Sequence, residues 1–304
     1  KTLTWQQDNT HSPVIDAGDP TDSAEAEPLP NGAIINMGAY GGTSQASKST
    51  IDLLAEVVFA DPLLKEAIEE RLGVIDPTII DMRELIELES INTVNDGIKD
   101  LTGLEHAVHL RALKLAYSQI DDISPIAGLN QLTELIINDN RIKDITPLSG
   151  LIHLQKMDLH RNQIEDLAPL AGLMNLEHLF LRWNQIRDIS PLADLLNLRT
   201  LNLRRNVVED IGPLVTLVDL EVLNLGYNRI TDISVLSNLP NLTHLDLSHN
   251  RFRDISALTT LFALERLDLE LVFTLNRQAY SQHLPTILDS NPGITLLYDP
   301  DPFQ

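Results

Sequence analysis

The most regular feature of the chain is a hydrophobic pattern that repeats every 22 residues. The frame begins at Leu110 and starts again at Leu132, Leu154, Leu176, Leu198, Leu220, Leu242 and Leu264, with a weaker copy at Leu88. Each copy follows L-x-x-L-x-L-x-x-N-x-I-x-D-I-x-P-L-x-x-L-x-x, in which seven positions are apolar in nearly every copy. A fixed period of this size predicts a solenoid, in which each repeat forms one coil and stacked coils bury a shared core.

The order of residues within a repeat predicts the structure of each coil. The L-x-L segment alternates with period two, which indicates a strand with one face turned inward. Stacked coils would pair these strands in parallel into one curved sheet. The later Ser-Pro, Thr-Pro, Ala-Pro or Gly-Pro step predicts a helix start, with a capping residue before a proline at the first helical position. The remaining residues leave room for only a short 3-10 turn on the convex side.

Two polar positions also recur through the repeats. The ninth position holds Ser118, Asn140, Asn162, Asn184, Asn206, Asn228 and Asn250, and the thirteenth holds Asp122, Asp144, Asp166, Asp188, Asp210, Asp232 and Asp254. Asparagine can bond backbone groups of adjacent coils that lack other partners. Stacked carboxylates about 5 Å apart repel unless each accepts backbone N–H groups near a helix start. We predict this structural role for the aspartates, with ion binding as the alternative.

This set of positions resembles the leucine-rich-repeat family and, within it, the 22-residue class of bacterial internalin-like proteins. The resemblance covers about residues 88–271. It implies an α/β repeat fold, a leucine-rich-repeat solenoid with a parallel concave sheet and short 3-10 turns on the convex side. A solenoid also needs both ends of its core covered.

The segments on either side of the repeats fit such caps. In residues 51–87, "DPLLKEAIEERLG" has Asp61 as a helix N-cap, Pro62 in the first turn and Gly73 at the stop, and "TIID" at 78–81 is a second candidate capping box. This segment resembles the helical N-terminal cap of bacterial repeat proteins. In residues 272–304, a helix and a final strand are expected to close the other end, where Val272 interrupts the asparagine column.

The first fifty residues follow a different pattern. "HSPVIDAGDP" and "INMGAYGGT" resemble the last turns of right-handed parallel β-helix domains in exported bacterial proteins. We therefore expect residues 1–50 to be the C-terminal remnant of such a domain and the chain to be a mature product or an excised piece. This resemblance implies an extracellular or cell-surface location, with the signal peptide outside this chain. Asp16 and Asp19 fit either a backbone-capping turn or a Ca²⁺ site.

Composition narrows the classes of function. The net charge of −22 without any global basic surface argues against nucleic acid or anionic membranes as partners. There is no cysteine, which excludes disulfides, thiol catalysis and thiolate metal sites. No apolar run approaches the roughly 18 residues of a membrane-spanning helix. The nine histidines show no metal-binding spacing, so we expect no metal, no cofactor and no enzymatic activity.

A cationic and aromatic patch is the candidate binding site. It would lie on the concave face, where adjacent strands are about 4.8 Å apart, so that Trp183 sits between Arg161 and Arg205. The candidate residues are His160, Arg161, His178, Phe180, Arg182, Trp183, Arg204, Arg205 and Tyr227. Arginine, tryptophan and tyrosine are enriched at binding hot spots.

A simpler interpretation of the patch is also open. Arg161 and Arg205 would stack on Trp183 and cover the ring without any ligand. Like charges at Arg182 and Arg204, on adjacent strands, favour an anionic ligand unless an acid of the chain, such as Asp158, neutralises them.

These features favour a non-enzymatic recognition module of an exported bacterial protein that binds a protein partner on the concave face. One alternative is the binding of an acidic polysaccharide, since aromatic rings and arginines suit such a polymer. Another is an accessory domain of a larger carbohydrate-active enzyme whose catalytic residues lie upstream. A third is a structural surface or filament subunit that associates with its own copies.

Overall fold

The computed structural model describes residues 56–73, 85–86, 88–94, 97–300 and 302. The chain divides into two compact units, one of Lys1–Glu56 with Asp81–Arg83 and the other of Val57–Ile80 with Glu84–Gln304. The fold set out below is that of the second unit. The predicted β-helix remnant at 1–50, with Asp16 and Asp19, and the second capping box at 78–81 lie outside the described residues.

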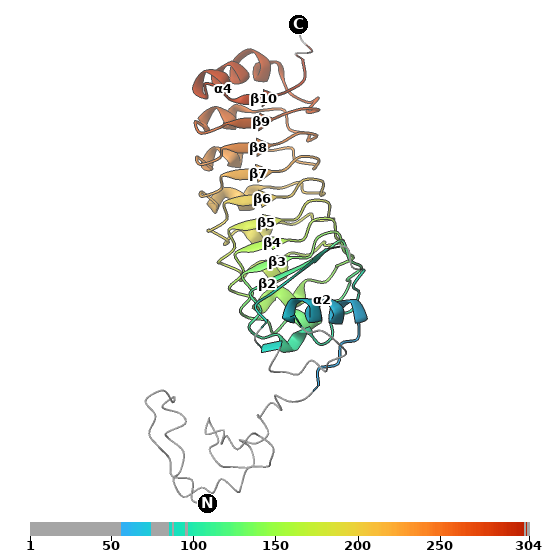
Figure 1. Cartoon of the computed structure of the whole chain (residues 1–304). Helices are drawn as coiled ribbons and strands as arrows, with labels where there is room; N and C mark the ends of the chain where they lie inside the picture. The colour runs from blue at the N-terminus through green and yellow to red at the C-terminus, as the bar shows by residue number, and fades with distance from the viewer. Residues whose placement is uncertain (1–55, 74–84, 87, 95–96, 301, 303–304) are drawn as a thin grey trace, which may run out of the picture. The chain divides into compact units, whose positions relative to one another are not determined.

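The second unit is built on a parallel sheet whose ten strands follow one another in sequence order (Figure 1). The strands are β1 (Ser90–Val94), β2 (Ala112–Ala116), β3 (Glu134–Ile136), β4 (Lys156–Asp158), β5 (His178–Phe180), β6 (Thr200–Asn202), β7 (Val222–Asn224), β8 (His244–Asp246), β9 (Arg266–Asp268) and β10 (Thr295–Leu297). From β1 to β9 the register shifts by one repeat per strand, so that Leu135 pairs with Leu113 on one side and Met157 on the other. Each position of the repeat therefore forms a straight column of side chains.

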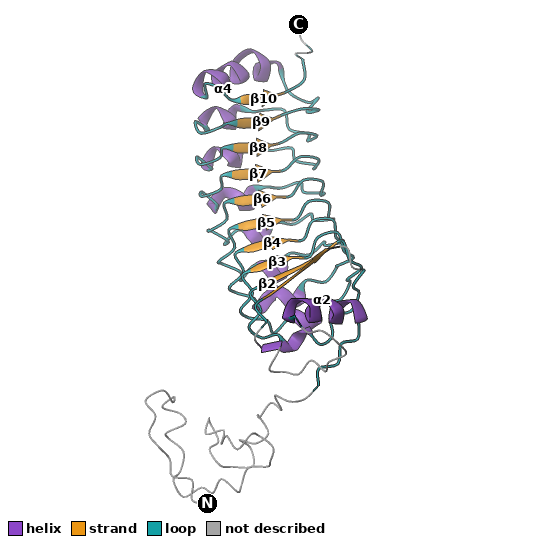
Figure 2. Ribbon diagram, viewed as in Figure 1, coloured by secondary structure: helices purple, strands orange, loops and turns teal. Residues whose placement is uncertain are grey.

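A short 3-10 turn follows each of the strands β1 to β8, and Figure 2 shows these turns succeeding one another along the stack. They are Leu104–His106, Ser124–Ile126, Thr146–Gly150, Ala168–Leu170, Ser190–Leu192, Gly212–Thr216, Ser234–Asn238 and Ser256–Thr260. The predicted 3-10 turns are confirmed. The expected capping by the residue before proline is wrong, because that residue is the first residue of the turn itself.

The aspartate column caps these turns instead. Asp188 Oδ1 accepts the backbone N–H of Ser190 at 2.8 Å, and all seven aspartates of the column make the equivalent bond. This bond is the main cause that lowers the pKa of Asp188 and of Asp232 from the ordinary value. The predicted structural role of the aspartates is therefore confirmed.

The seven apolar columns form the core of the solenoid. In the coil that begins at Leu176, all seven apolar residues are only 0–1% exposed. Stacking identical leucines in register gives each one neighbours of the same shape above and below. Truncating one such leucine to alanine typically costs about 2–5 kcal/mol, so the repeat pattern itself carries much of the stability.

The asparagine column joins each coil to the previous one, as predicted. Asn184 Oδ1 accepts the N–H of Ile164 at 3.0 Å, and its Nδ2 donates to the carbonyls of Leu159 and Leu181 at 3.0 Å each. The other five asparagines of the column make the same three bonds. These side chains satisfy buried backbone groups that the narrow turn leaves without partners.

Both ends of the repeats carry helices. The helix α2 (Pro62–Leu72) begins after Asp61, whose carboxylate accepts the N–H of Leu63 at 2.9 Å, and ends at Gly73 with φ of 72°. At the other end, a single π-helical turn, Ala279–His283, leads into α4 (Leu284–Ser290), and β10 then pairs with β9. The elements expected at 61–73 and 276–298 are thus present.

Asn291, at the C-terminal end, plays a role that was not predicted from the sequence. Its Oδ1 accepts the N–H of Leu264 at 3.0 Å, and its Nδ2 donates to the carbonyls of Leu261 and Ile287. This buried side chain repeats the asparagine bonding pattern from a residue outside the 22-residue frame. It takes over where Val272 ends the column.

Candidate functional site

The residue at the eighth position of every full repeat adopts a left-handed backbone conformation. The φ angles lie between 52° and 59° at Tyr117, Asp139, Arg161, Trp183, Arg205, Tyr227, His249 and Leu271. For residues other than glycine this conformation costs about 1–2 kcal/mol each, and aspartate and asparagine tolerate it best. The chain nevertheless places large rings and arginines here, so backbone preference does not explain these residue types. Sequence reasoning did not detect this conformation.

Five of the eight side chains at the eighth position form a continuous stack across successive coils. The Arg205 guanidinium lies 4.1 Å from the ring centroid of Trp183 and 4.1 Å from that of Tyr227. Arg161, from the coil before Trp183, lies 5.8 Å from the same indole. Tyr227 stacks on His249 with 3.5 Å between centroids and 16° between planes. We call Arg161, Trp183, Arg205, Tyr227 and His249 the stacked column. The predicted stacking of Arg161 and Arg205 on Trp183 is confirmed.

Acidic side chains neutralise the N-terminal end of the patch. Arg161 Nη1 lies 3.1 Å from Asp139 Oδ1. His160 lies between two carboxylates, with Nε2 3.0 Å from Asp139 and Nδ1 2.7 Å from Asp158. Asp158 is therefore the partner of His160, and the suggestion that it answers Arg182 and Arg204 is not borne out by its contacts.

Arg204 is also paired, by a contact that spans two coils. Its guanidinium bonds the Asp246 carboxylate, 42 residues away, and the Ser248 hydroxyl at 3.2 Å. The pair passes over Gly226, where a Cβ atom would come within 2.5 Å of Arg204 and 2.7 Å of Asp246. The missing side chain at Gly226 thus makes room for the pair. Arg204 is therefore neutralised by an acid of the chain, but by Asp246 and not by the suggested Asp158.

Two guanidinium groups of the patch form no ion pair within the described part of the chain. Among the described residues, Arg182 and Arg205 have no carboxylate within ion-pair distance, although Arg205 is held between two rings. Trp183, on which Arg205 stacks, remains 41% exposed and is not part of the hydrophobic core. Phe180 lies half-buried in the same coil, in β5, opposite Asp158 and Asn202.

The residues of the patch therefore divide into those held by neighbouring polar side chains and those that form no such contact. His160, Arg161 and Arg204 are fixed by acids, and His178 shares a 3.1 Å hydrogen bond with Thr200. Within the described part of the chain, no ion pair is formed by the other six patch residues, which are His178, Phe180, Arg182, Trp183, Arg205 and Tyr227. The structure brings all nine predicted residues together on neighbouring coils, and their role in binding stays a prediction.

His249 extends the patch beyond the residues found from sequence. Partial burial lowers the pKa of His249, and the charges of Arg204 and Arg205 lower it further. The ring stacked on Tyr227 is therefore favoured in its neutral form. Its identity as a histidine at the eighth position was visible in the sequence, but its stacking depends on the left-handed backbone.

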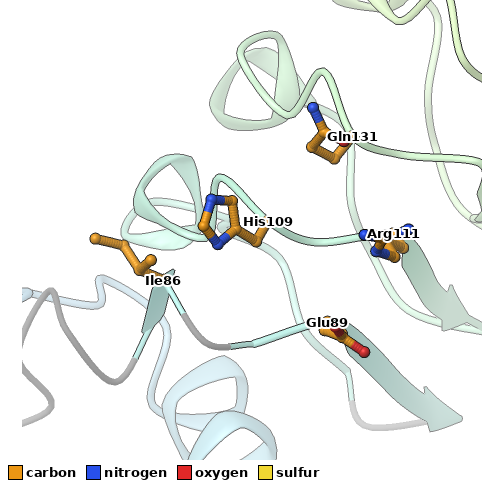
Figure 3. A pocket seen from close by; sticks show the side chains of 5 residues that line it. All are labelled: Ile86, Glu89, His109, Arg111 and Gln131. Atoms are coloured by element: carbon orange, nitrogen blue, oxygen red, sulfur yellow. The ribbon is translucent and has the colours of Figure 1, made fainter. Parts of the chain in front are cut away.

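Two hollows lie near the strands, and neither resembles a catalytic site. One of about 280 Å³ lies over β7–β9 and is lined in part by Asn224, Asp246 and Asp268. The other, of about 330 Å³, is shown in Figure 3 with its lining side chains Ile86, Glu89, His109, Arg111 and Gln131. These five side chains surround an open hollow and do not converge on one point, and all but Ile86 are exposed.

In the described part of the chain, no three His, Asp or Glu side chains are grouped so that they could hold a metal ion. None of the helices described is long and apolar enough to cross a membrane. What the patch offers chemically is recognition, because guanidinium groups bind carboxylate, sulfate or phosphate oxygens and the exposed rings supply apolar contact.

Comparisons with known proteins agree with the fold. The family model described as "Leucine Rich repeats (2 copies)" matches residues 108–150, 130–172, 152–194, 175–216, 196–238 and 218–260. The structure is similar to the crystal structure of internalin C2 from Listeria monocytogenes, with a TM-score of 0.70, 35% identity, and coverage of 72% of this chain and 100% of that one. A comparison with curated proteins gave no match.

A second solved structure shows the same fold at lower identity. The functional domain of InlJ from Listeria monocytogenes matches with a TM-score of 0.60 and 20% identity, covering 79% of this chain and 60% of that one. That domain is described as including a cysteine ladder, whereas this chain has no cysteine.

Taken together, the fold and the patch define a leucine-rich-repeat solenoid, a class that presents extended concave surfaces for binding. The family match and the 35% identity over the whole of internalin C2 make the assignment more specific. The chain belongs to the leucine-rich-repeat family and is an internalin-like member of it.

Proposed function

We propose that this chain is a non-enzymatic binding module that recognises an acidic segment of a protein partner on its concave face. The main support is that Arg182 and Arg205 have no carboxylate partner among the described residues, and that Arg205 stacks on the exposed Trp183. An acidic side chain of a partner would supply the missing charge. Phe180, Trp183 and Tyr227 would supply the apolar contact typical of binding hot spots.

The stack around Trp183 makes this surface rigid before binding. Arg205 is already ordered between two rings, and Arg204 is fixed by Asp246 across Gly226. A pre-ordered surface loses less side-chain entropy when a partner binds. The residues that already form ion pairs would thus position those without one, and Arg182 would make the main new ion pair with the partner.

We also propose that the chain is exported from a bacterium and acts outside the cell or at its surface. The support is the resemblance of residues 1–50 to β-helix domains of exported bacterial proteins. An accessory role beside a larger catalytic domain is compatible with the same binding face.

Selection from a displayed random peptide library tests the binding proposal. We expect the selected peptides to be rich in Asp and Glu and to bind the wild-type chain. Arg182→Gln should weaken that binding at least about tenfold, because a charge-assisted hydrogen bond is lost. The matched control is Arg187→Gln, which removes an arginine of the same coil that is 72% exposed and pairs with Glu209 elsewhere.

The outcomes of this selection are distinct. Peptides without acidic residues, or equal weakening by both variants, would contradict the proposed site. If no peptide is selected but uronate or sulfated polymers on a glycan array bind and are lost with Arg182→Gln, the ligand is an acidic polysaccharide instead of a protein.

A further inference from the structure

A second conspicuous surface lies away from the concave sheet, at the 21st position of the repeat. Six successive coils place apolar residues there, all exposed: Ile152, Met174, Leu196, Val218, Pro240 and Phe262. The exposed fractions of five of them run from 47% to 70%. We call these six residues the apolar stripe. Six coils about 4.8 Å apart make it about 25 Å long.

Hydrogen bonds at this edge confirm that the stripe runs across adjacent coils. Asn175 donates to the carbonyl of Ile152 at 2.8 Å, and Asn197 donates to that of Met174 at 2.7 Å. Asn241 makes the equivalent bond to Val218 at 3.0 Å. The amides that border the stripe are therefore turned toward their own backbone, which leaves the apolar side chains as the main exposed surface.

The positions next to the stripe within each coil carry little charge, although the position three residues after it is charged in four of the six coils, at Glu177, Arg199, Glu221 and Glu265. Positions 18, 19, 21 and 22 of these six coils comprise 24 residues, of which only Asp194 and Asp219 are acidic and none is Lys or Arg. The chain as a whole has 22% charged residues and a net charge of −22. A contiguous exposed apolar surface of this kind marks an interaction site.

We infer that the apolar stripe is the contact face of an antiparallel dimer of this chain. The apolar residues recur at the spacing of the coils, so a second copy of the stripe presents its side chains at the same spacing. A two-fold axis between Leu196 and Val218 pairs these two residues across the interface, and it pairs Ile152 with Phe262 of the second copy. Twofold interfaces of this type are the commonest in homo-oligomers.

Charge and size also favour a second copy as the occupant. Two chains of charge −22 repel, and the stripe is a face on which they can approach with few charges. In the antiparallel arrangement Asp219 faces Asn197 of the second copy and Asp194 faces Thr216, so like charges do not meet. The 24 residues of the face fall within the roughly 20–30 residues a side of a standard interface.

Sedimentation velocity over a range of concentrations tests the inference first. The wild-type chain should form a dimer as concentration rises, and Leu196→Glu should weaken the dimer at least about tenfold, because it buries a charge at the axis. Phe273→Glu is the matched control, since Phe273 is 76% exposed and lies outside the stripe. Circular dichroism of each variant confirms that the fold is kept. A wild-type chain that stays monomeric, or equal effects of the two variants, would overturn the inference.

Cysteine cross-linking tests the antiparallel arrangement, because the chain has no cysteine of its own. A mixture of Ile152→Cys and Phe262→Cys chains should form a disulfide-linked heterodimer. Each variant alone should not, because identical positions would lie about 24 Å apart, beyond disulfide reach. Cross-linking of Ile152→Cys with itself would point to a parallel pairing and overturn the arrangement.

Discussion

Replacing Asn184 by alanine should destabilise the chain by about 2–4 kcal/mol, far more than its small size suggests. The side chain is only 9% exposed and makes three bonds to backbone groups. Alanine leaves the buried N–H of Ile164 with no acceptor, which costs about 1–3 kcal/mol. The carbonyls of Leu159 and Leu181 each lose one bond.

The loss at these two carbonyls is only partial. Leu159 also accepts from Asn162 at 3.0 Å, and Leu181 also accepts from Asn206 at 3.0 Å. Each carbonyl therefore keeps one partner, which adds about 0.5 kcal/mol apiece and keeps the total below the cost of three orphaned groups. The neighbouring asparagines thus set the upper bound of the effect.

Urea denaturation gives the measurement. The midpoint should fall without a change in slope if the fold is otherwise intact. Asn175→Ala is the control, because this exposed asparagine makes a single bond to the carbonyl of Ile152, and it should cost less than about 1 kcal/mol. A loss below about 0.5 kcal/mol for Asn184→Ala would show that the asparagine bonds between coils do not stabilise the stack.

Three further predictions concern the patch. Gly226→Ala should destabilise the chain by about 1–3 kcal/mol in urea denaturation, since the new Cβ displaces Arg204 from its carboxylate; an unchanged midpoint would contradict this. Trp183→Gly should be more stable than Trp183→Ala by about 1 kcal/mol in the same assay, because φ is 59° there, and the reverse order would refute the strain argument. The lowered pKa of His249 means that its contribution to stability is complete above the ordinary pKa of 6.5 and is lost as the pH falls through the lower folded value. His249→Phe should therefore lose less stability than the wild-type chain between about pH 7.5 and pH 5, and an equal loss would exclude this histidine as a cause.

Most of the fold could be predicted because the successive copies of the repeat can be compared with one another. Eight copies of the frame show which positions are always apolar, and a 22-residue shift between parallel strands places each column in register. The roles of Asn184 and Asp188 followed from the same logic, since each serves backbone groups near its own position. Asn291 was not predicted because it follows the C-terminal helix α4 as its C-cap and lies outside the 22-residue frame.

The candidate site was predictable only in part. Neighbouring columns placed Trp183 beside Arg161 and Arg205 correctly, because such contacts join adjacent coils. The pairing of Arg204 with Asp246 was missed, since it skips a coil and depends on the absent side chain of Gly226. The pairing of adjacent strands alone does not predict a contact between coils that are two repeats apart.

The most direct test of the binding face is the fluorescence of Trp183 during titration with an acidic peptide selected on the chain. The chain has two tryptophans, Trp5 and Trp183, so a Trp5→Phe variant leaves Trp183 as the only indole reporter. We predict a saturable change in its emission, with the apparent Kd raised at least about tenfold by Arg182→Gln and unchanged by Arg187→Gln. Binding that leaves the Trp183 emission unaltered, or that is indifferent to Arg182, would contradict the concave patch as the recognition surface.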